Sequence, residues 1–378
     1  MRGKKDGPVG VGVVGTGMIS DTYLDNLTSF PDLVVLIVGG RTPARATTQA
    51  ERYGVPLWGT TEDVLAHPDV EIVVNLTVPA AHAAITSQAL AAGKHVWSEK
   101  PISSDRATAQ SLLDQADAAG LLIGVAPDTV LGPGLQTARR AIVRGDIGTP
   151  LTARTVLQYT GPDLFHPNPG FLFAPGAGPL FDVGPYYLTA LVHIFGPVAR
   201  VSALGSTARP TRTVQVGELA GTTFPVTVPT HVSALIEYAN GAISESTFSF
   251  DSPLTRIGLF EVTGTEATLV LPDPNDFTGD IRLTRPPSTL DQLTEPPVWE
   301  TLHSRGAVAG RGIGVVDMAR AIRTGSAALA SGQLAYHVLD VMSAIDDSIT
   351  SHQSVDVAST TNAIPLVPED WDPYAATL

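Results

Sequence analysis

Short apolar runs alternate with amphipathic stretches through the first third of the chain. The apolar runs that predict strands lie at residues 9–14, 33–38, 72–76, 95–97 and 122–125. Between them, the spacing of apolar positions predicts helices at residues 18–29, 43–53, 80–92 and 103–119. Strands that alternate with helices in this way are typical of a parallel, doubly wound sheet with right-handed crossovers. We therefore expect an N-terminal α/β domain over residues 8–127.

The pattern changes in the rest of the chain, where strands follow one another directly. Runs rich in β-branched residues lie at residues 198–203, 227–238, 242–250, 256–263 and 267–271. Short turns such as Asn240-Gly241 indicate a mostly antiparallel sheet. Helices are predicted around these strands, at residues 135–144, 180–195, 312–323 and 334–350. We expect an α+β domain over residues 128–352, followed by a C-terminal tail at 353–378.

The composition is that of an ordinary globular protein. The 378 residues are 43% hydrophobic and 16% charged, which suits two domains with substantial cores. A net charge of -14 argues against nucleic acid or an anionic membrane as a partner, because both bind basic surfaces. The chain has no cysteine, which excludes disulfides, thiolate metal ligands and a cysteine nucleophile.

Neither a secretion signal nor a membrane segment is indicated by the sequence. Residues 1–8 carry charges, but residues 9–14 run directly into a glycine turn instead of forming the apolar part of a signal peptide. No apolar run reaches the length that a bilayer requires. We therefore expect a cytoplasmic protein.

A glycine turn follows the first predicted strand. Gly15 and Gly17 permit a tight turn and the close approach of a pyrophosphate, which then lies at the N-terminus of the helix that begins with Met18 and Ile19. Ser20 takes the place of the third glycine of the usual fingerprint and is small enough for close packing. The position between a strand and a helix favours a dinucleotide site over a purely structural turn.

The end of the second predicted strand bears on the choice of cofactor. An NAD site usually has an acidic residue here, which binds the ribose 2′-hydroxyl. This chain has Gly40, Arg41 and Thr42 instead. A small residue, a cation and a hydroxyl suit a 2′-phosphate, so we expect NADP to be preferred and NAD to be the alternative. The competing interpretation is that Arg41 is a solvated residue at a helix start.

Lysine is rare in this chain, which has only Lys4, Lys5, Lys94 and Lys100. Lys100 lies in the segment Glu99-Lys100-Pro101, at the carboxyl end of a predicted strand, where doubly wound sheets bind their ligands. An ammonium can donate a proton or fix a hydroxyl, whereas a guanidinium stays protonated. Pro101 can take a cis bond that turns Lys100 toward the crevice. The structural alternative is a surface lysine paired with Glu99.

A second cluster of polar residues follows a loop rich in glycine and proline at residues 161–179. Asp182 and Tyr186 are four residues apart, so they share one face of the predicted helix. Pro185 between them is compatible with a helix that starts near Phe181, because N–H groups in the first turn have no intrahelical partner. The structural alternative is a core tyrosine and an N-terminal aspartate cap.

With these segments the chain resembles the glucose–fructose oxidoreductase / inositol dehydrogenase / rhizopine-catabolism family (Gfo/Idh/MocA). The resemblance rests on the glycine turn, on Glu99-Lys100-Pro101 after Ala92-Gly93-Lys94-His95-Val96, and on Asp182 to Tyr186. It implies a Rossmann domain followed by a domain with a large open sheet, which commonly forms an oligomer interface. We expect a homodimer or homotetramer through that sheet.

The resemblance also implies roles for single residues. Lys100, Asp182 and Tyr186 correspond to the catalytic residues of the family, with Tyr186 as the acid/base where many members have histidine. The loop from Thr77 to His82 resembles one that runs along the cofactor, although His82 could equally cap the following helix. Glu99 and Lys100 of the triplet belong to the cofactor site as well. The substrate implied is a sugar, glycoside or cyclic polyol.

Two further residues are candidates for binding substrate hydroxyls. His166 lies in the glycine- and proline-rich loop, and Asp128 follows the last predicted strand of the first domain, beside Thr129. The alternative for each of these residues is a purely structural role. The nine histidines show no helical pairing with carboxylates at zinc-ligand spacing, so we predict no metal.

Three functions fit these residues. The first is an NAD(P)-dependent oxidoreductase in which Tyr186 exchanges a proton with the substrate hydroxyl; a nearby Lys100 ammonium favours the phenolate, whose pKa is otherwise about 10. The second is a redox-neutral glycoside-processing enzyme that keeps its nicotinamide bound. The third is a non-catalytic sensor of dinucleotides. Lys100 and Tyr186 together argue against the sensor, and turnover without added nicotinamide would distinguish the second function from the first.

Overall fold

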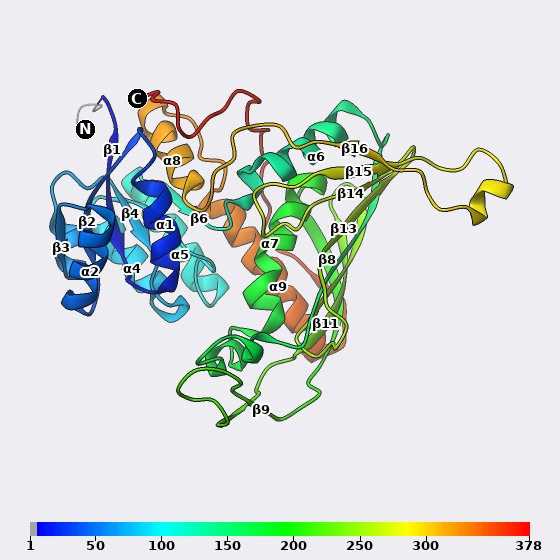
Figure 1. The fold of residues 1–378 in the computed structure, drawn as a ribbon, viewed down its shortest axis with the longest axis horizontal. Coiled ribbons are helices and arrows are strands. Elements are labelled where there is room, and N and C mark those ends of the chain that lie inside the picture. Colours follow the sequence, from blue (N-terminus) through cyan, green and yellow to red (C-terminus); the bar gives the residue numbers. More distant parts are fainter. Residues whose placement is uncertain (1–5) are drawn as a thin grey trace. The chain divides into compact units, whose positions relative to one another are not determined.

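The computed structural model describes residues 6–378, which form two compact units (Figure 1). The first unit contains the described residues up to Gly132, together with Gly306–Leu339 and Val367–Leu378. The second contains Pro133–Arg305 and Asp340–Leu366. Residues 306–339, expected in the second domain from the sequence, return to the first unit. The charged residues at positions 1–5, which include Lys4 and Lys5, lie outside the described part of the chain.

The first unit is built on a six-stranded parallel sheet with the order β3-β2-β1-β4-β5-β6. Its strands are β1 (Val9–Val14), β2 (Leu33–Gly39), β3 (Leu57–Gly59), β4 (Ile72–Asn75), β5 (His95–Ser98) and β6 (Ile123–Val125). Its helices are α1 (Met18–Leu27), α2 (Pro43–Tyr53), α3 (Thr61–Ala66), α4 (Pro79–Ala91), α5 (Arg106–Ala119) and α8 (Ile313–Thr324). The predicted doubly wound sheet is confirmed, with the strand order of a Rossmann fold.

Close packing explains why the first strand contains two glycines. All six residues of β1 are buried, and a side chain at Gly10 would begin 2.1 Å from the carbonyl oxygen of Asp69. At Gly12 it would begin 2.6 Å from the Val64 side chain of α3. Glycine therefore lets α3 and the chain before β4 lie directly against β1.

The second unit contains a nine-stranded sheet with the order β16-β15-β14-β13-β7-β12-β11-β8-β17. Its strands are β7 (Pro150–Gln158), β8 (Val198–Ser206), β11 (His231–Tyr238), β12 (Ile243–Ser249), β13 (Arg256–Gly264), β14 (Thr268–Val270), β15 (Ile281–Thr284), β16 (Glu300–Leu302) and β17 (Val355–Asp356). Only β7 and β12 pair in parallel, so the predicted mostly antiparallel sheet is confirmed. Two short strands, β9 (Thr211–Thr213) and β10 (Thr223–Pro225), form a separate hairpin-like pair.

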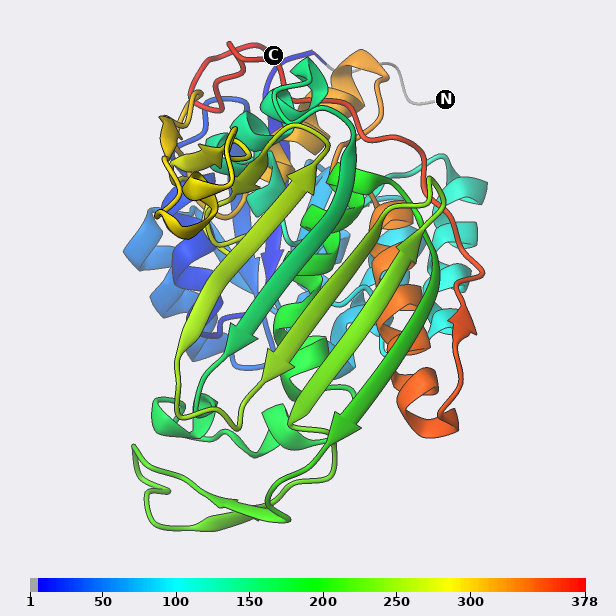
Figure 2. The same cartoon turned by 90° about the vertical axis from the view of Figure 1, so that its right-hand side faces the viewer.

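Helices cover one face of this sheet. The helices that the unit uses are α6 (Pro133–Arg144), α7 (Gly178–Phe195) and the second half of α9 (Gly332–Ser351). Helix α7 contacts β7, β11 and β12. Figure 2 shows this helix behind the sheet, whose opposite face is turned to the viewer and is covered by no α-helix among the described residues. Along β11, buried residues alternate with exposed or partly exposed ones, as a strand with one covered face requires.

Among the described residues, no helix is long and apolar enough to cross a membrane.

Candidate functional site

The glycine turn of the first unit has the geometry that a pyrophosphate requires. Gly15 has a φ of +119°, and a side chain there would begin 2.5 Å from the carbonyl oxygen of Leu76. Gly17 is the N-cap of α1, and a side chain at that position would meet nothing within 4 Å. Met18 is 74% exposed and Ile19 partly exposed at the same helix start. The surface at the N-terminus of α1 is therefore open to an anionic ligand.

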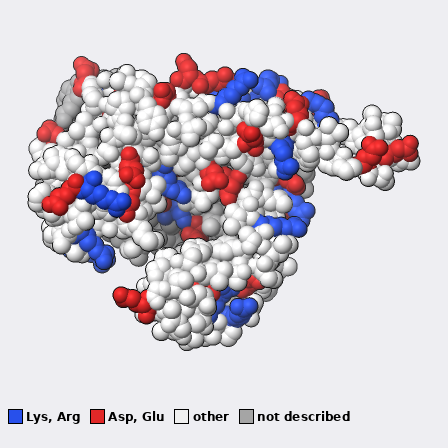
Figure 3. Space-filling model, in the orientation of Figure 1, with Lys and Arg blue, Asp and Glu red and all other residues white. Residues whose placement is uncertain are grey.

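The end of β2 carries exposed cationic side chains. Gly40 is buried, whereas Arg41 and Arg45 are exposed, and Thr42 is the N-cap of α2. The segment at the end of β2, Gly39-Gly40-Arg41-Thr42, contains no acidic residue. On the face of the first unit that Figure 3 displays, acidic and basic side chains are interspersed. The residues present thus fit a dinucleotide, and the fit includes room and charge for a 2′-phosphate.

Lys100 follows β5, and its main chain is fixed by its neighbours. The bond between Lys100 and Pro101 is cis, as expected from the sequence. The Lys100 N–H donates to Glu99 Oε2 at 3.2 Å, and Glu99 Oε1 accepts a hydrogen bond from the Tyr23 hydroxyl at 2.8 Å. The Trp97 indole N–H in turn lies 3.3 Å from the Tyr23 oxygen. Glu99 is buried and uses both carboxylate oxygens to position the segment that carries Lys100.

The loop after β4 brings Thr77 and His82 together. Asn75 Oδ1 accepts hydrogen bonds from the Thr77 hydroxyl at 2.7 Å and from the Thr77 N–H at 3.3 Å. His82 is 1% exposed, with Nε2 2.9 Å from the Thr77 carbonyl oxygen and Nδ1 2.8 Å from that of Pro101. The structure therefore places the His82 ring between two loops, and the cofactor contact expected from the sequence stays a prediction.

Asp128 is fully buried at the carboxyl end of β6. Its Oδ2 accepts the N–H groups of Gly312 at 2.8 Å and Gly314 at 3.1 Å, so the carboxyl caps the N-terminus of α8. Burial raises the pKa of Asp128 to about 6, although the two backbone hydrogen bonds oppose the shift. Asp128 therefore has the structural role that the sequence left open as the alternative to a substrate contact, and the contact itself stays a prediction.

In the second unit, α7 carries the other predicted catalytic residues. The helix begins at Gly178, so Pro185 lies inside it and not in its first turn as the sequence suggested. Asp182 is partly exposed, and Tyr186, one turn later on the same face, is 7% exposed. The neighbouring Tyr187 faces the sheet, where it is fully buried and accepts the Gly258 N–H at 3.0 Å.

The segment between β7 and α7 contains aromatic residues that no motif in the sequence selects, and one of them, Tyr159, lies near Asp182. Burial raises the pKa of Tyr159, and the Asp182 carboxylate raises it further. The Tyr159 ring stacks on Phe165, which is 64% exposed, with centroids 6.4 Å apart. His166 is partly exposed, accepts the Asn168 N–H at 3.0 Å and packs edge-on against Phe171. Tyr159 directly follows β7 and belongs to no motif, so sequence alone gives no signal for it.

Within residues 6–378, no group of three or more histidine, aspartate or glutamate side chains is arranged to hold a metal ion.

Two family models match the chain. One, described as the oxidoreductase family with an NAD-binding Rossmann fold, matches residues 9–126. The other, described as the GFO/IDH/MocA C-terminal domain, matches residues 135–270. Together they cover both the sheet of the first unit and the core strands of the second.

Curated relatives extend over most of the same region. Trans-1,2-dihydrobenzene-1,2-diol dehydrogenase of Bos taurus is 27% identical over 268 residues, which are 70% of this chain and 74% of the relative. Levoglucosan dehydrogenase of Pseudarthrobacter phenanthrenivorans is 27% identical over 288 residues, 69% of this chain and 72% of its own. D-xylose dehydrogenase of Paenarthrobacter nicotinovorans is 30% identical over 188 residues, 48% of each chain.

Solved structures share the fold over nearly the whole chain. Levoglucosan dehydrogenase in complex with NADH and levoglucosan has a TM-score of 0.79 at 22% identity, covering 93% of this chain and 99% of that one. An NAD binding oxidoreductase from Klebsiella pneumoniae has a TM-score of 0.79 at 23% identity, with the same coverage.

Proposed function

Because this chain belongs to the GFO/IDH/MocA family of NAD-binding oxidoreductases, we propose that it is an NAD(P)-dependent dehydrogenase of a sugar, glycoside or cyclic polyol. The reacting group is a ring carbinol or the corresponding ketone. The observation that carries the proposal is the pair of motifs Glu99-Lys100-Pro101 and Asp182 to Tyr186 in one chain with an open glycine turn. The names of the curated relatives, which include sugar and diol dehydrogenases, support the substrate class.

The protein's own task in this reaction is to move one proton and to hold one carbon in place. The nicotinamide, when bound, accepts or supplies the hydride. Tyr186 takes the proton from the substrate hydroxyl during oxidation and returns it during reduction. The Lys100 ammonium favours the phenolate and polarises the substrate oxygen, while Asp182 orients a neighbouring hydroxyl.

The proposed cofactor site lies in the first unit. Gly15, Gly17 and the N–H groups at Met18 and Ile19 would hold the pyrophosphate, and Thr77 and Glu99 belong to loops at the carboxyl edge of the same sheet. Arg41, with Thr42, supports a preference for NADP over NAD, because a 2′-phosphate gains a cation there and meets no carboxylate. His166 and Tyr159 are proposed to contact the substrate from the loop before α7.

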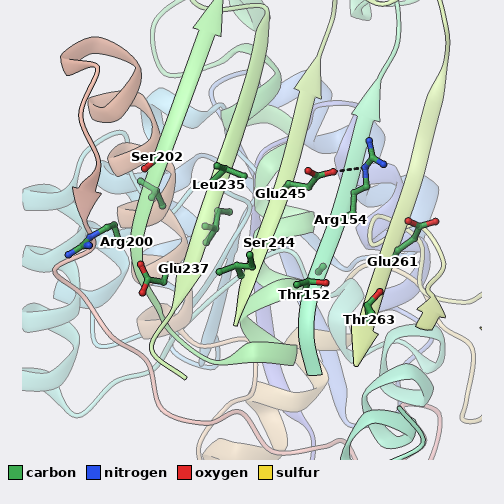
Figure 4. A pocket seen from close by; sticks show the side chains of 14 residues that line it. Thr152, Arg154, Arg200, Ser202, Leu235, Glu237, Ser244, Glu245, Glu261 and Thr263 are labelled. Carbon is green, nitrogen blue, oxygen red and sulfur yellow. Dashed lines mark ion pairs between the residues drawn. The ribbon is translucent and has the colours of Figure 1, made fainter. Parts of the chain in front are cut away.

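We also propose that the open face of the second unit's sheet joins copies of this chain. Exposed leucine and isoleucine side chains lie on it, including Leu204, Leu235 and Ile243, which are 67%, 62% and 54% exposed. Figure 4 shows the hollow on this face, where Arg154 pairs with Glu245 at 2.6 Å beside further charged and polar side chains. A face that combines apolar residues with both signs of charge can pair with its own copy about a two-fold axis.

The test of the proposed function is nicotinamide absorbance, measured with a panel of sugars, glycosides and cyclic polyols and with NAD and NADP in turn. We expect at least one ring substrate to be oxidised with added cofactor. Consumption of a glycoside without added nicotinamide, by protein that carries the cofactor through purification, would support the redox-neutral alternative. Cofactor binding without turnover of any compound, in either direction, would support the sensor.

A further inference from the structure

His82 is a buried polar side chain that contacts two of the candidate cofactor loops. It is the fourth residue of α4, and its 1% exposure leaves the ring enclosed by protein. Its two ring nitrogens lie 2.8 Å and 2.9 Å from carbonyl oxygens on two different loops, those of Pro101 and Thr77. These loops follow β5 and β4, which are neighbours in the sheet.

Each loop held by His82 is fixed on its other side as well. The Thr77 N–H and hydroxyl donate to Asn75 Oδ1, and Asn75 Nδ2 donates to the carbonyl oxygen of His82 itself at 3.0 Å. On the β5 side, the Lys100 N–H donates to Glu99 Oε2. The main chain around Lys100 is therefore held before it by Glu99 and after it by His82.

The chemistry of the ring explains why histidine suits this position. Both acceptors are carbonyl oxygens, which cannot donate. A neutral imidazole carries one N–H and satisfies one of them, whereas the doubly protonated ring satisfies both. The planar ring spans the two loops with a nitrogen facing each of them, an arrangement that an amide or hydroxyl side chain cannot reproduce.

We propose that His82 is the positioning residue that sets Lys100 relative to the loop at Thr77. The inference rests on the proposed function, in which Lys100 acts on the substrate oxygen. Loss of the bond to the Pro101 carbonyl lets the Lys100 segment shift, and a misplacement of about 1 Å can cost roughly 100-fold in rate. His82 acts through Lys100 and touches neither substrate nor cofactor.

The first test is a double-mutant cycle between His82→Phe and Lys100→Ala. Phenylalanine keeps a ring of similar size and removes both ring nitrogens. We expect His82→Phe to lower kcat by roughly 10- to 100-fold in the natural protein, with the cofactor Kd changed by less than about threefold. In the Lys100→Ala background, where nothing remains to be positioned, the same substitution should change kcat by less than about twofold.

A matched control separates positioning from stability. His95, at the opposite end of β5, accepts the Leu122 N–H at 2.9 Å through its own ring. His95→Phe removes this hydrogen bond from the same strand, so it should lower Tm while kcat stays unchanged. His82→Gln, which retains one donor group, should recover part of the kcat lost in His82→Phe.

The outcomes distinguish this inference from the proposed function. The role of His82 is overturned if His82→Phe lowers kcat equally in the natural protein and in Lys100→Ala. It is also overturned if His82→Phe does not lower kcat in the natural protein. Full turnover by Lys100→Ala instead overturns the catalytic role of Lys100 itself. If Lys100→Ala has no measurable turnover, 13C-labelled lysine gives an independent readout, because the chain has only four lysines. The Lys100 signal should then shift and broaden in His82→Phe while the Lys94 signal stays; an unchanged Lys100 signal rejects the proposal.

Discussion

The expected preference for NADP rests on one side chain, Arg41, at the exposed start of α2. A guanidinium bonded to a phosphate contributes roughly 1.5–3 kcal/mol, which corresponds to a 10- to 100-fold difference in affinity. Arg41→Ala should therefore weaken NADP binding by about that factor and leave NAD binding nearly unchanged, as measured by fluorescence titration. Arg52→Ala is the control, because it removes a guanidinium at the other end of α2 that pairs with Asp21 and lies over the Tyr53 ring. Equal affinities for both cofactors in the natural protein would overturn the preference.

Lys100 is the second residue whose identity matters chemically. Lys100→Ala should lower kcat by roughly 100-fold or more, because the proposed mechanism uses this ammonium to stabilise the phenolate and to polarise the substrate oxygen. Lys100→Arg should not restore the rate, since its planar, permanently protonated group cannot replace a compact ammonium. Lys100 and Tyr186 belong to different units. A double-mutant cycle therefore tests whether the two residues act on the same proton. The losses in Lys100→Ala and Tyr186→Phe should combine to less than their sum in free energy.

At the scale of elements, the sequence predicted the longer segments with a clear hydrophobic period and missed the short ones. Residues 9–14 and 43–53 match β1 and α2 to the residue, because a buried apolar run and a helix bounded by Pro43 and Gly54 are unambiguous. The three-residue β3 and six-residue α3 escaped prediction, since so few residues establish no period. The start of α7 was placed too late because Pro185, here inside the helix, was read as a first-turn proline.

The candidate site was predictable only where a motif marks it. The spacing of residues in the glycine turn, the Lys100 segment and the pair on α7 is typical of this kind of site, so the sequence could propose them. The inward orientation of His82 and the capping of α8 by Asp128 depend on contacts between segments that are distant in sequence, 184 residues apart in the second case. Tyr159 was missed for the same reason, because its closeness to Asp182 arises only when the sheet and α7 pack together.

The cap on α8 should make stability depend on pH. The pKa of Asp128 is raised by burial from 3.8 to about 6, so its ionised form is disfavoured in the folded protein. Its stabilising contribution is therefore present below about pH 4 and lost as pH rises through about 6; a shift of about two pKa units corresponds to about 3 kcal/mol. Asp128→Asn keeps a carbonyl acceptor for α8 and removes the ionisation.

Urea unfolding at pH 4.5 and pH 7.5 tests this prediction. The free energy of unfolding of Asp128→Asn, relative to the natural protein, should rise by about 1–3 kcal/mol between the two conditions. The buried His95, whose pKa is lowered to about 4, makes stability fall as pH drops below about 6.5, but it does so in both proteins and cancels in the comparison. A difference that does not change with pH would contradict the assignment.

At the scale of the whole molecule, the open sheet predicts self-association. Sedimentation at micromolar concentration should give a dimer or tetramer, and Leu235→Glu should dissociate it by placing a charge beside Glu237 and Glu245 on the exposed face. Val143→Glu, at a 70% exposed position on α6, is the matched control and should leave the assembly intact. A natural protein that remains monomeric, or a Leu235→Glu variant that still assembles, would reject this face as the interface.

The central claim, that this oxidoreductase moves a substrate proton through Tyr186, is tested most directly by comparing Tyr186→Phe with Tyr187→Phe. The two substitutions remove the same atom from adjacent residues of α7, and the Tyr187 hydroxyl only holds the Gly258 N–H within the core. Measured by nicotinamide absorbance on the best substrate, turnover should fall by roughly 100-fold or more in Tyr186→Phe, with cofactor binding retained. The acceleration of oxidation with rising pH should vanish in the same variant. Tyr187→Phe should lower stability and keep its turnover. If Tyr186→Phe retains most of the activity, or if both variants lose it equally, Tyr186 is not the acid/base.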